Sequence, residues 1–279
     1  MQAITALEFK HISKLLHEQC GIHLQDDQDY LVQTRLGDLV ESLGLNSFSQ
    51  LVERLQVEPE KLLPAVINLM TTNETLWFRD QSCWNALEKA ILPELFKKVE
   101  CGEEVKVWIA GCSTGQEAYS LALLIDELCQ AQKKTAWVRH FSIQAMDISE
   151  TALQTARLAS YNTFEINRGL SLTRRTHYFE QTANNHWVLR PNIRLRVHFD
   201  TINLTRDFSH LGRFDLILCR NVTIYFTPQV RSKILSTMVS MLTPEGSLLL
   251  GATESLWHQR NSYRAIEFEG CIYVKAVCV

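Results

Sequence analysis

The sequence predicts an α/β protein in two parts: a helical N-terminal region, followed by a mostly parallel β-sheet with helices on both faces. Two observations lead to this prediction. Through roughly the first 70 residues, apolar side chains recur at helical spacing and show no strand-like alternation. From about residue 80 onward, short β-rich apolar runs alternate with longer helical segments, which is the pattern of a parallel sheet covered on both faces.

The N-terminal region contains three helical patterns. A first amphipathic helix is expected within residues 1–19, and a second over 31–43, ending at Gly44. Asn46 is then expected to cap a third helix over 47–56. No strand-like run interrupts them, so we expect an all-α N-terminal domain.

The second part carries the strands. They are expected at residues 105–111, 141–149, 214–222, 247–253 and 271–279, with another between 193 and 203. Ser149 is placed to cap a helix over 150–159, and Pro228 lies in the first turn of a helix over 228–242. Residues 170–200 interrupt the alternation with short segments separated by turn residues, which predicts a small antiparallel insertion.

Composition excludes several classes of protein. The 279 residues are 46% apolar and 21% charged with a net charge of −3, so no overall basic field favours nucleic acid. No apolar run reaches the roughly 20 residues of a membrane helix, and the start lacks a secretion signal. We therefore expect a cytoplasmic protein without direct membrane insertion. The eight cysteines form no CxxC pair, and those in apolar runs, such as Cys219 and Cys278, are expected to be buried thiols rather than metal ligands.

A glycine loop and an acid indicate a ligand site. Gly111 and Gly115 lie between the first strand and its helix, where glycine lets backbone N–H groups approach a ligand. The loop is neither GxGxxG nor a Walker sequence, which disfavours phosphate binding. Asp147 ends the second strand, where a carboxylate can accept hydrogen bonds from ribose hydroxyls. Asp147 could also simply precede a helix start, and the pair fits either a dinucleotide or S-adenosylmethionine.

Four segments decide between these ligands. They resemble the CheR family of chemotaxis receptor methyltransferases and occur in the family's order: MTTNETLWFRD (70–80), VWIAGCSTGQEAYSLA (107–122), AMDIS (145–149) and FDLILCRNVTIYF (214–226). The resemblance runs from about residue 5 to the C-terminus. It implies a Rossmann-like class I methyltransferase domain with a small antiparallel β insertion, preceded by the all-α domain. The expected boundaries are 1–75 for the helical domain and linker, 76–279 for the methyltransferase domain, and about 170–200 for the insertion.

The resemblance also implies the site residues. Arg79 and Tyr225 are the expected catalytic residues, with Tyr225 near the transferable methyl group. Asp147 matches the family's ribose-binding acid. The full set expected to contact S-adenosylmethionine is Asn73, Thr75, Arg79, Gly111, Glu117, Asp147, Asn203, Leu204, Arg220 and Asn221. Without the resemblance, Arg79 is an ordinary surface ion-pair partner, Tyr225 a core tyrosine and Asn221 a turn residue.

The implied reaction transfers the methyl group of S-adenosylmethionine to glutamates on the cytoplasmic helices of methyl-accepting chemoreceptors, leaving S-adenosylhomocysteine. A glutamate with an ordinary pKa of about 4.3 is ionised at neutral pH. Alignment alone can contribute about 7–11 kcal/mol, so neither a general base nor a metal is expected. Arg79 either holds the substrate carboxylate in a bidentate contact or holds the carboxylate of the cofactor, and the sequence leaves both open.

Two departures from the family bear on partners. The receptor-docking helix is usually rich in arginine, whereas here it reads RLGDLVESLGL (35–45), which keeps Arg35 but adds Asp38 and Glu41. These changes leave open a divergent receptor or a signalling array outside chemotaxis. The first hairpin of the insertion, YFEQTANNHWV (178–188), lacks the glycines of relatives that bind a receptor's C-terminal pentapeptide, so we expect no such tether.

The sequence disfavours three other functions. A protein that senses S-adenosylmethionine or S-adenosylhomocysteine without turnover is disfavoured because Arg79, Asp147, Asn221 and Tyr225 are all present. Methylation of a small carboxylic acid does not explain the separate helical domain. A nicotinamide oxidoreductase ranks last, since the loop is not GxGxxG.

Overall fold

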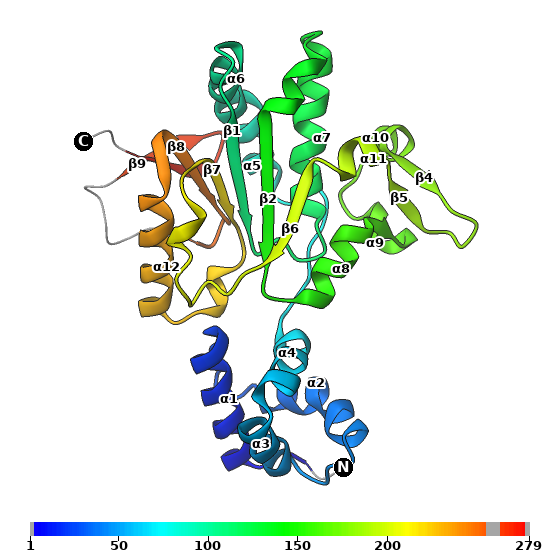
Figure 1. Ribbon diagram of the computed structural model, residues 1–279, viewed down its shortest axis with the longest axis vertical. Coiled ribbons are helices and arrows are strands. Elements are labelled where there is room, and N and C mark those ends of the chain that lie inside the picture. Colours follow the sequence, from blue (N-terminus) through cyan, green and yellow to red (C-terminus); the bar gives the residue numbers. More distant parts are fainter. Residues whose placement is uncertain (1–2, 255–262, 277–279) are drawn as a thin grey trace.

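The computed structural model describes residues 3–254 and 263–276 of the chain. Four helices pack together at the N-terminus, and a linker leads from them to a sheet flanked by helices (Figure 1). The N-terminal helices are α1 (Ala6–Cys20), α2 (Asp29–Ser42), α3 (Phe48–Val57) and α4 (Pro59–Met70). The predicted all-α N-terminal domain followed by a Rossmann-like domain is confirmed.

Capping side chains fix where two of these helices, α1 and α3, begin. Thr5 accepts a hydrogen bond from the backbone N–H of Glu8, whose carboxylate accepts one in return from the backbone N–H of Thr5, a reciprocal arrangement that satisfies otherwise unpaired donors. At α3 the cap is Ser47, whose hydroxyl accepts from the N–H of Gln50. The prediction that Asn46 caps this helix is wrong by one residue.

The main sheet has seven strands in the order β6-β2-β1-β7-β8-β10-β9. Five are parallel, whereas β10 runs antiparallel to both β8 and β9. The strands are β1 (Val105–Ala110), β2 (Phe141–Asp147), β6 (Val197–Thr201), β7 (Phe214–Cys219), β8 (Leu242–Leu250), β9 (Tyr263–Phe268) and β10 (Cys271–Ala276). Strand β9 is missing from the sequence prediction because it is mostly exposed and only weakly apolar.

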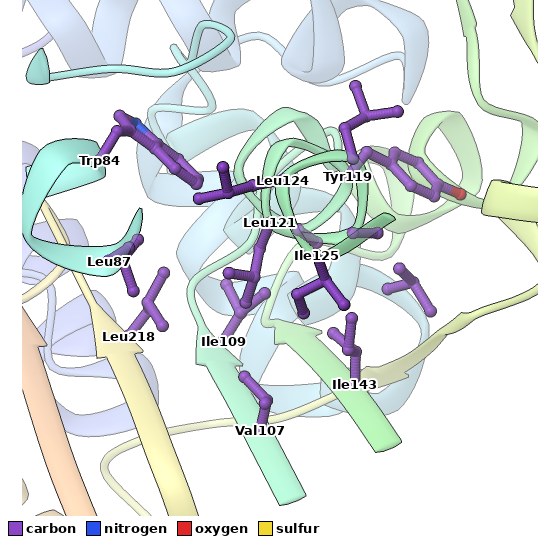
Figure 2. Packing of buried hydrophobic residues seen from close by; sticks show 14 of the residues in the cluster. Trp84, Leu87, Val107, Ile109, Tyr119, Leu121, Leu124, Ile125, Ile143 and Leu218 are labelled. Atoms are coloured by element: carbon purple, nitrogen blue, oxygen red, sulfur yellow. The ribbon is translucent and has the colours of Figure 1, made fainter. Parts of the chain in front are cut away.

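Helices cover both faces of this sheet. On β1, Val107 and Ile109 join the core under α7, whereas Trp108 and Ala110 join the core under α12. Figure 2 shows the first face, where Leu121 of α7 packs over the strands. The helices of this domain are α5 (Gln81–Ala86), α6 (Leu92–Glu100), α7 (Gln116–Ala131), α8 (Glu150–Leu158) and α12 (Pro228–Ser240). Each large apolar side chain buried in this way contributes about 1.5–3 kcal/mol.

The predicted insertion forms a small three-stranded antiparallel sheet in the order β3-β5-β4. Its elements are β3 (Ser160–Tyr161), α9 (Thr163–Asn167), α10 (Leu172–Tyr178), β4 (Phe179–Gln181), β5 (Trp187–Leu189) and α11 (Pro191–Arg194). Within the insertion, residues 172–178 form a helix, which Ser171 caps. The strand expected between 193 and 203 is confirmed as β6, which pairs with β2 in the main sheet.

The cysteines of the described ranges are free thiols. Cys219 is buried, as predicted, whereas Cys101 is exposed. Cys278 lies outside the described residues. Within residues 3–254 and 263–276, no helix has the length and apolar character needed to cross a membrane.

Candidate functional site

A cavity lies where the carboxyl ends of the strands meet the N-terminal helices. Its empty space, including the part that is open to solvent at the mouth, is about 980 Å³. The parallel strands β1, β2 and β7 all end here, so the residues that follow each strand come together. All eleven site residues predicted from the sequence line it: Asn73, Thr75, Arg79, Gly111, Glu117, Asp147, Asn203, Leu204, Arg220, Asn221 and Tyr225. Segments far apart in sequence therefore line one cavity.

The loop after β1 requires its glycine. Gly111 has φ 73°, and a Cβ there would lie 2.3 Å from Cγ2 of Val222. The backbone N–H groups of Gly111 and Cys112 both donate to the carbonyl of Met146, at 2.7 and 3.0 Å. The glycine thus lets this loop pack against the segment that follows β7, and both line the cavity.

Asp147 presents a buried carboxylate at the end of β2. One oxygen accepts from the backbone N–H of Ser113 at 2.7 Å, and the other from that of Ser149 at 2.9 Å. Burial raises the pKa of Asp147, while these backbone donors oppose the rise. Because a carboxylate offers about four acceptor positions, room remains for two further donors.

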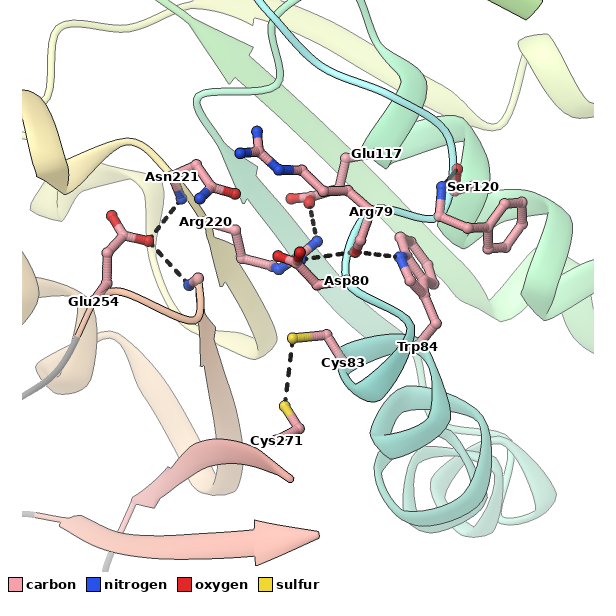
Figure 3. Close-up of polar contacts among 12 residues, drawn as sticks. Arg79, Asp80, Cys83, Trp84, Glu117, Ser120, Arg220, Asn221, Glu254 and Cys271 are labelled. Atoms are coloured by element: carbon pink, nitrogen blue, oxygen red, sulfur yellow. Dashed lines mark hydrogen bonds and ion pairs between the residues drawn. The ribbon is translucent and has the colours of Figure 1, made fainter. Parts of the chain in front are cut away.

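Arg220 does not reach freely into the cavity. Its side chain is fully buried and donates to the carboxylates of Glu117 and Asp80 and, at 2.8 Å, to the backbone carbonyl of Arg79 (Figure 3). Burial alone would lower the pKa of Arg220, but the nearby negative groups, Glu117 first, outweigh it and raise the pKa. Its Nε has no hydrogen-bond partner among the described residues. Glu117 and Arg220 therefore form a charged pair in the wall of the cavity.

Arg79 behaves differently. Its backbone carbonyl is held by Arg220 and by the indole N–H of Trp84, at 2.8 and 2.9 Å. Its half-buried guanidinium lines the cavity and has no ion pair within the described part of the chain. Tyr225 is also half-buried and lines the cavity. Arg79 is thus fixed at its backbone and has a side chain available for a ligand.

The linker after α4 is fastened to the sheet. The hydroxyl of Ser113 donates to the carbonyl of Asn73 at 2.7 Å, and the amide of Asn73 donates to the hydroxyl of Ser149 at 3.3 Å. Thr75 follows in the same segment, and its side chain makes no hydrogen bond among the described residues. These contacts bring the linker against the loops that follow β1 and β2.

Asn203 joins the two domains. Its amide nitrogen donates to the carbonyl of Gln19 in α1 at 2.7 Å, and its oxygen accepts from the backbone N–H and hydroxyl of Thr205. Nearby, the N–H of His23 donates to the carbonyl of Tyr225 at 2.9 Å. Both ends of the Asn203 amide are engaged within the protein, and the buried Leu204 follows it in the wall.

Sequence reasoning missed several wall residues. Cys20, Ile22 and Met70 of the helical domain line the cavity, yet nothing in their local sequence distinguishes them from other apolar residues. Glu254, behind the segment after β7, is also absent from the prediction. Arg35, which the resemblance places on the receptor-docking helix, donates to the carbonyls of Met70 and Thr71 and to the hydroxyl of Thr72.

A Rossmann-like sheet with a cavity at the carboxyl ends of its strands defines an α/β protein that binds a small ligand there. Residues 73–271 match the family described as "CheR methyltransferase, SAM binding domain", and residues 7–71 match "CheR methyltransferase, all-alpha domain". The chain belongs to the CheR methyltransferase family and is an S-adenosylmethionine-dependent methyltransferase.

Curated relatives match over almost the full length. The chain is 39% identical to "Chemotaxis protein methyltransferase 1" of Pseudomonas aeruginosa, covering 95% of this chain and 97% of that protein. It is also 39% identical to the protein of the same name from Vibrio cholerae, covering 98% and 99%. A "Chemotaxis protein methyltransferase" of Borreliella burgdorferi is 29% identical, covering 92% and 91%.

Among the charged residues of the site, Glu117 and Arg220 pair with each other and Asp147 accepts from backbone N–H groups. Among residues 3–254 and 263–276, no three His, Cys, Asp or Glu side chains are grouped so that they could hold a metal ion.

Proposed function

We propose that this chain transfers the methyl group of S-adenosylmethionine to glutamate carboxylates on chemoreceptors, giving methyl esters that adjust receptor signalling. The observation that carries the proposal is the cavity between the two domains. Arg79, which has no ion pair within the described part of the chain, and the buried Asp147 face the same space there. The names of the relatives supply the chemotaxis context.

The residues present suit the cofactor. Asp147 has acceptor positions left for two ribose hydroxyls after its two backbone contacts. Asn203 and Leu204 line the part of the wall proposed for adenine, and Gly111 keeps its loop free of a side chain that would collide with Val222. The loop and linker residues Asn73, Thr75 and Asn221 complete the proposed contacts, and Glu117 and Arg220 brace the wall as a charged pair.

When bound, S-adenosylmethionine supplies an electrophilic methyl group. A receptor glutamate is already ionised at neutral pH, so the residues of this chain need only align it and exclude water. We propose that Arg79 orients the substrate carboxylate with its guanidinium fork and that Tyr225 shapes the space around the reacting oxygen. If Arg79 instead binds the cofactor's own carboxylate, Arg79→Lys should weaken binding of the cofactor as well as slow methyl transfer.

We further infer the setting. The acceptors are the cytoplasmic helices of methyl-accepting receptors, which makes the enzyme cytoplasmic, and neither nucleic acid nor direct membrane insertion is involved. The hairpin of the insertion lacks glycines over residues 178–188, so a receptor's C-terminal pentapeptide is not proposed as a tether. Arg35 donates to the linker, so we do not assign it to the receptor contact.

The test is a transfer reaction with methyl-labelled S-adenosylmethionine and a purified receptor signalling fragment. Methyl esters of glutamate release methanol in mild alkali, whereas methyl groups on nitrogen do not. We expect receptor-bound label that is released by alkali and that maps to glutamate residues by mass spectrometry. Alkali-stable label would contradict ester formation, and binding of S-adenosylhomocysteine without transfer to any receptor would favour the sensor alternative.

A further inference from the structure

A single buried carboxylate accepts hydrogen bonds from several backbone N–H groups that follow β7. The carboxylate of Glu254 accepts hydrogen bonds from the N–H groups of Asn221, Val222 and Thr223 at 2.6, 3.1 and 2.7 Å. It also accepts from the hydroxyl of Thr223 at 2.6 Å and from the N–H of Gly251 at 2.9 Å. Three consecutive N–H groups converging on one anion form a backbone nest, part of which is drawn in Figure 3.

Among residues 3–254 and 263–276, these hydrogen-bond donors are what offsets the charge of Glu254. Glu254 is only 7% exposed, and within the described residues it has no ion pair with a basic side chain. An unpaired buried carboxylate is strongly unfavourable unless donors surround it, and here five donors do so. The five donors therefore offset the cost of burying this carboxylate.

The nest holds a strained segment. Asn221 has φ 58°, a left-handed conformation that non-glycine residues adopt at a cost. Gly251 permits the close approach, because a Cβ there would lie 2.7 Å from Oε2 of Glu254 and 2.9 Å from the backbone nitrogen of Asn221. Glu254 thus ties the end of β7 to the end of β8.

This segment forms part of the cavity wall. Arg220, Asn221, Val222 and Tyr225 all line the cavity, whereas Glu254 does not. On the opposite side of Arg220, Glu117 holds its side chain. The carboxylate of Glu254 therefore fixes the backbone of residues 221–223, and the carboxylate of Glu117 fixes the side chain of Arg220.

We propose that Glu254 is a positioning residue for methyl transfer. Its carboxylate holds residues 221–223 in the conformation that sets Asn221 and Tyr225 in the wall of the cofactor cavity. The inference rests on the proposed function, since it takes the cavity to be the S-adenosylmethionine site.

The test is calorimetric titration of the full chain with S-adenosylhomocysteine, combined with kcat and receptor KM from the methylation assay. In Glu254→Gln an NH2 group faces N–H donors, so we expect the Kd to rise at least about tenfold at a stoichiometry near one. We expect kcat to fall and receptor KM to stay unchanged. Glu254→Asp keeps the charge but is too short to reach both strand ends, so it should not restore affinity.

Two further variants sharpen the result. Thr223→Val removes only the hydroxyl donor and should raise the Kd about two- to threefold. Glu267→Gln, on the exposed face of β9, is the matched control and should bind like the wild type.

The proposal is overturned if Glu254→Gln keeps the wild-type Kd, or if Glu254→Asp restores it, which would assign the effect to charge alone. It is also overturned if the loss appears only as reduced stoichiometry, because that marks a folding defect. Failure of the wild type itself to bind would instead contradict the proposed function.

Discussion

At the scale of single residues, Arg79 and Arg220 differ in what their guanidinium groups touch. Arg220 is fully buried and paired with Glu117 and Asp80, whereas the side chain of Arg79 has no ion pair within the described residues. The side chain of Arg220 is therefore part of the cavity wall, whereas the side chain of Arg79 is available to a ligand. This contrast supports a substrate-facing role for Arg79 rather than Arg220.

We expect Arg79→Lys to lower kcat for receptor methylation by roughly 100-fold, because lysine cannot make a bidentate contact to a carboxylate. If Arg79 orients the substrate, the Kd for S-adenosylhomocysteine should stay within about twofold of the wild type. Arg157→Lys, in an exposed ion pair with Glu150, is the control and should retain activity. A large loss of cofactor affinity in Arg79→Lys would place the contact on the cofactor instead.

Asp147 predicts a pH dependence. Burial raises its pKa above the ordinary value of 3.8, and hydroxyl donors from a ligand favour the ionised form. Affinity for S-adenosylhomocysteine should therefore fall as pH falls through the raised pKa, and binding should release a proton there. In the same window the unliganded protein should lose stability as pH rises, since its folded state retains a proton that the unfolded chain has released.

Asp147→Asn checks this assignment. Burial also raises the pKa of Glu117 in the same cavity, so two carboxyl groups can contribute to the pH dependence. In Asp147→Asn the slope of log Kd against pH should therefore decrease by up to one proton but should not become zero. Titrations at several mildly acidic pH values measure the slope. An unchanged slope in Asp147→Asn would show that another group titrates.

At the scale of elements, the end of α1 forms a seam with the loops after β6 and β7. Gly21 ends α1 with φ 75°, and a Cβ there would lie 2.5 Å from Cγ2 of Thr205 and 3.0 Å from the ring of Phe226. The seam closes one side of the cavity, because Cys20 and Ile22 flank this glycine and line the wall.

Gly21→Ala should destabilise the fold by about 1–2 kcal/mol, because alanine is strained at this positive φ. The added Cβ should also push α1 away from the loops after β6 and β7. We expect a lower melting temperature together with roughly tenfold weaker binding of S-adenosylhomocysteine. Gly44→Ala is a matched control, since Gly44 has φ 70° but nothing within 4 Å of the added Cβ. Gly44→Ala should lower the melting temperature and leave the affinity for S-adenosylhomocysteine unchanged. Equal cofactor affinity in the two variants would mean that the seam does not shape the site.

Particular residues show what the sequence could and could not predict. Asp147 and Gly111 are predictable because the end of a parallel strand and the turn that follows it have recognisable local patterns. The contact of Asn203 with Gln19 joins positions 184 residues apart, and the contacts of Glu254 are to backbone N–H groups. Neither leaves a pattern in one sequence, because backbone partners carry no residue identity and distant pairs depend on how the domains pack.

At the scale of the whole molecule, the cavity is built by both domains. Met70 of the helical domain and Asn221 of the sheet domain lie in the same wall, and Arg35 fixes the linker between them through three hydrogen bonds. A ligand in this cavity therefore contacts both domains, and its binding energy should stabilise them together.

S-adenosylhomocysteine at 100 times its Kd should stabilise the folded chain by about 2.7 kcal/mol. We expect one calorimetric unfolding transition that moves to higher temperature as a unit. Two transitions, only one of which responds to the ligand, would show that a single domain holds the cofactor.

The central claim is that this cavity is the cofactor site of a methyltransferase. The most direct measurement is calorimetric titration of the purified chain with S-adenosylhomocysteine, alongside Asp147→Ala. We expect micromolar binding by the wild type, about −8 kcal/mol, that collapses in the variant. Absence of binding by the wild type, or unchanged binding by Asp147→Ala, would contradict the claim.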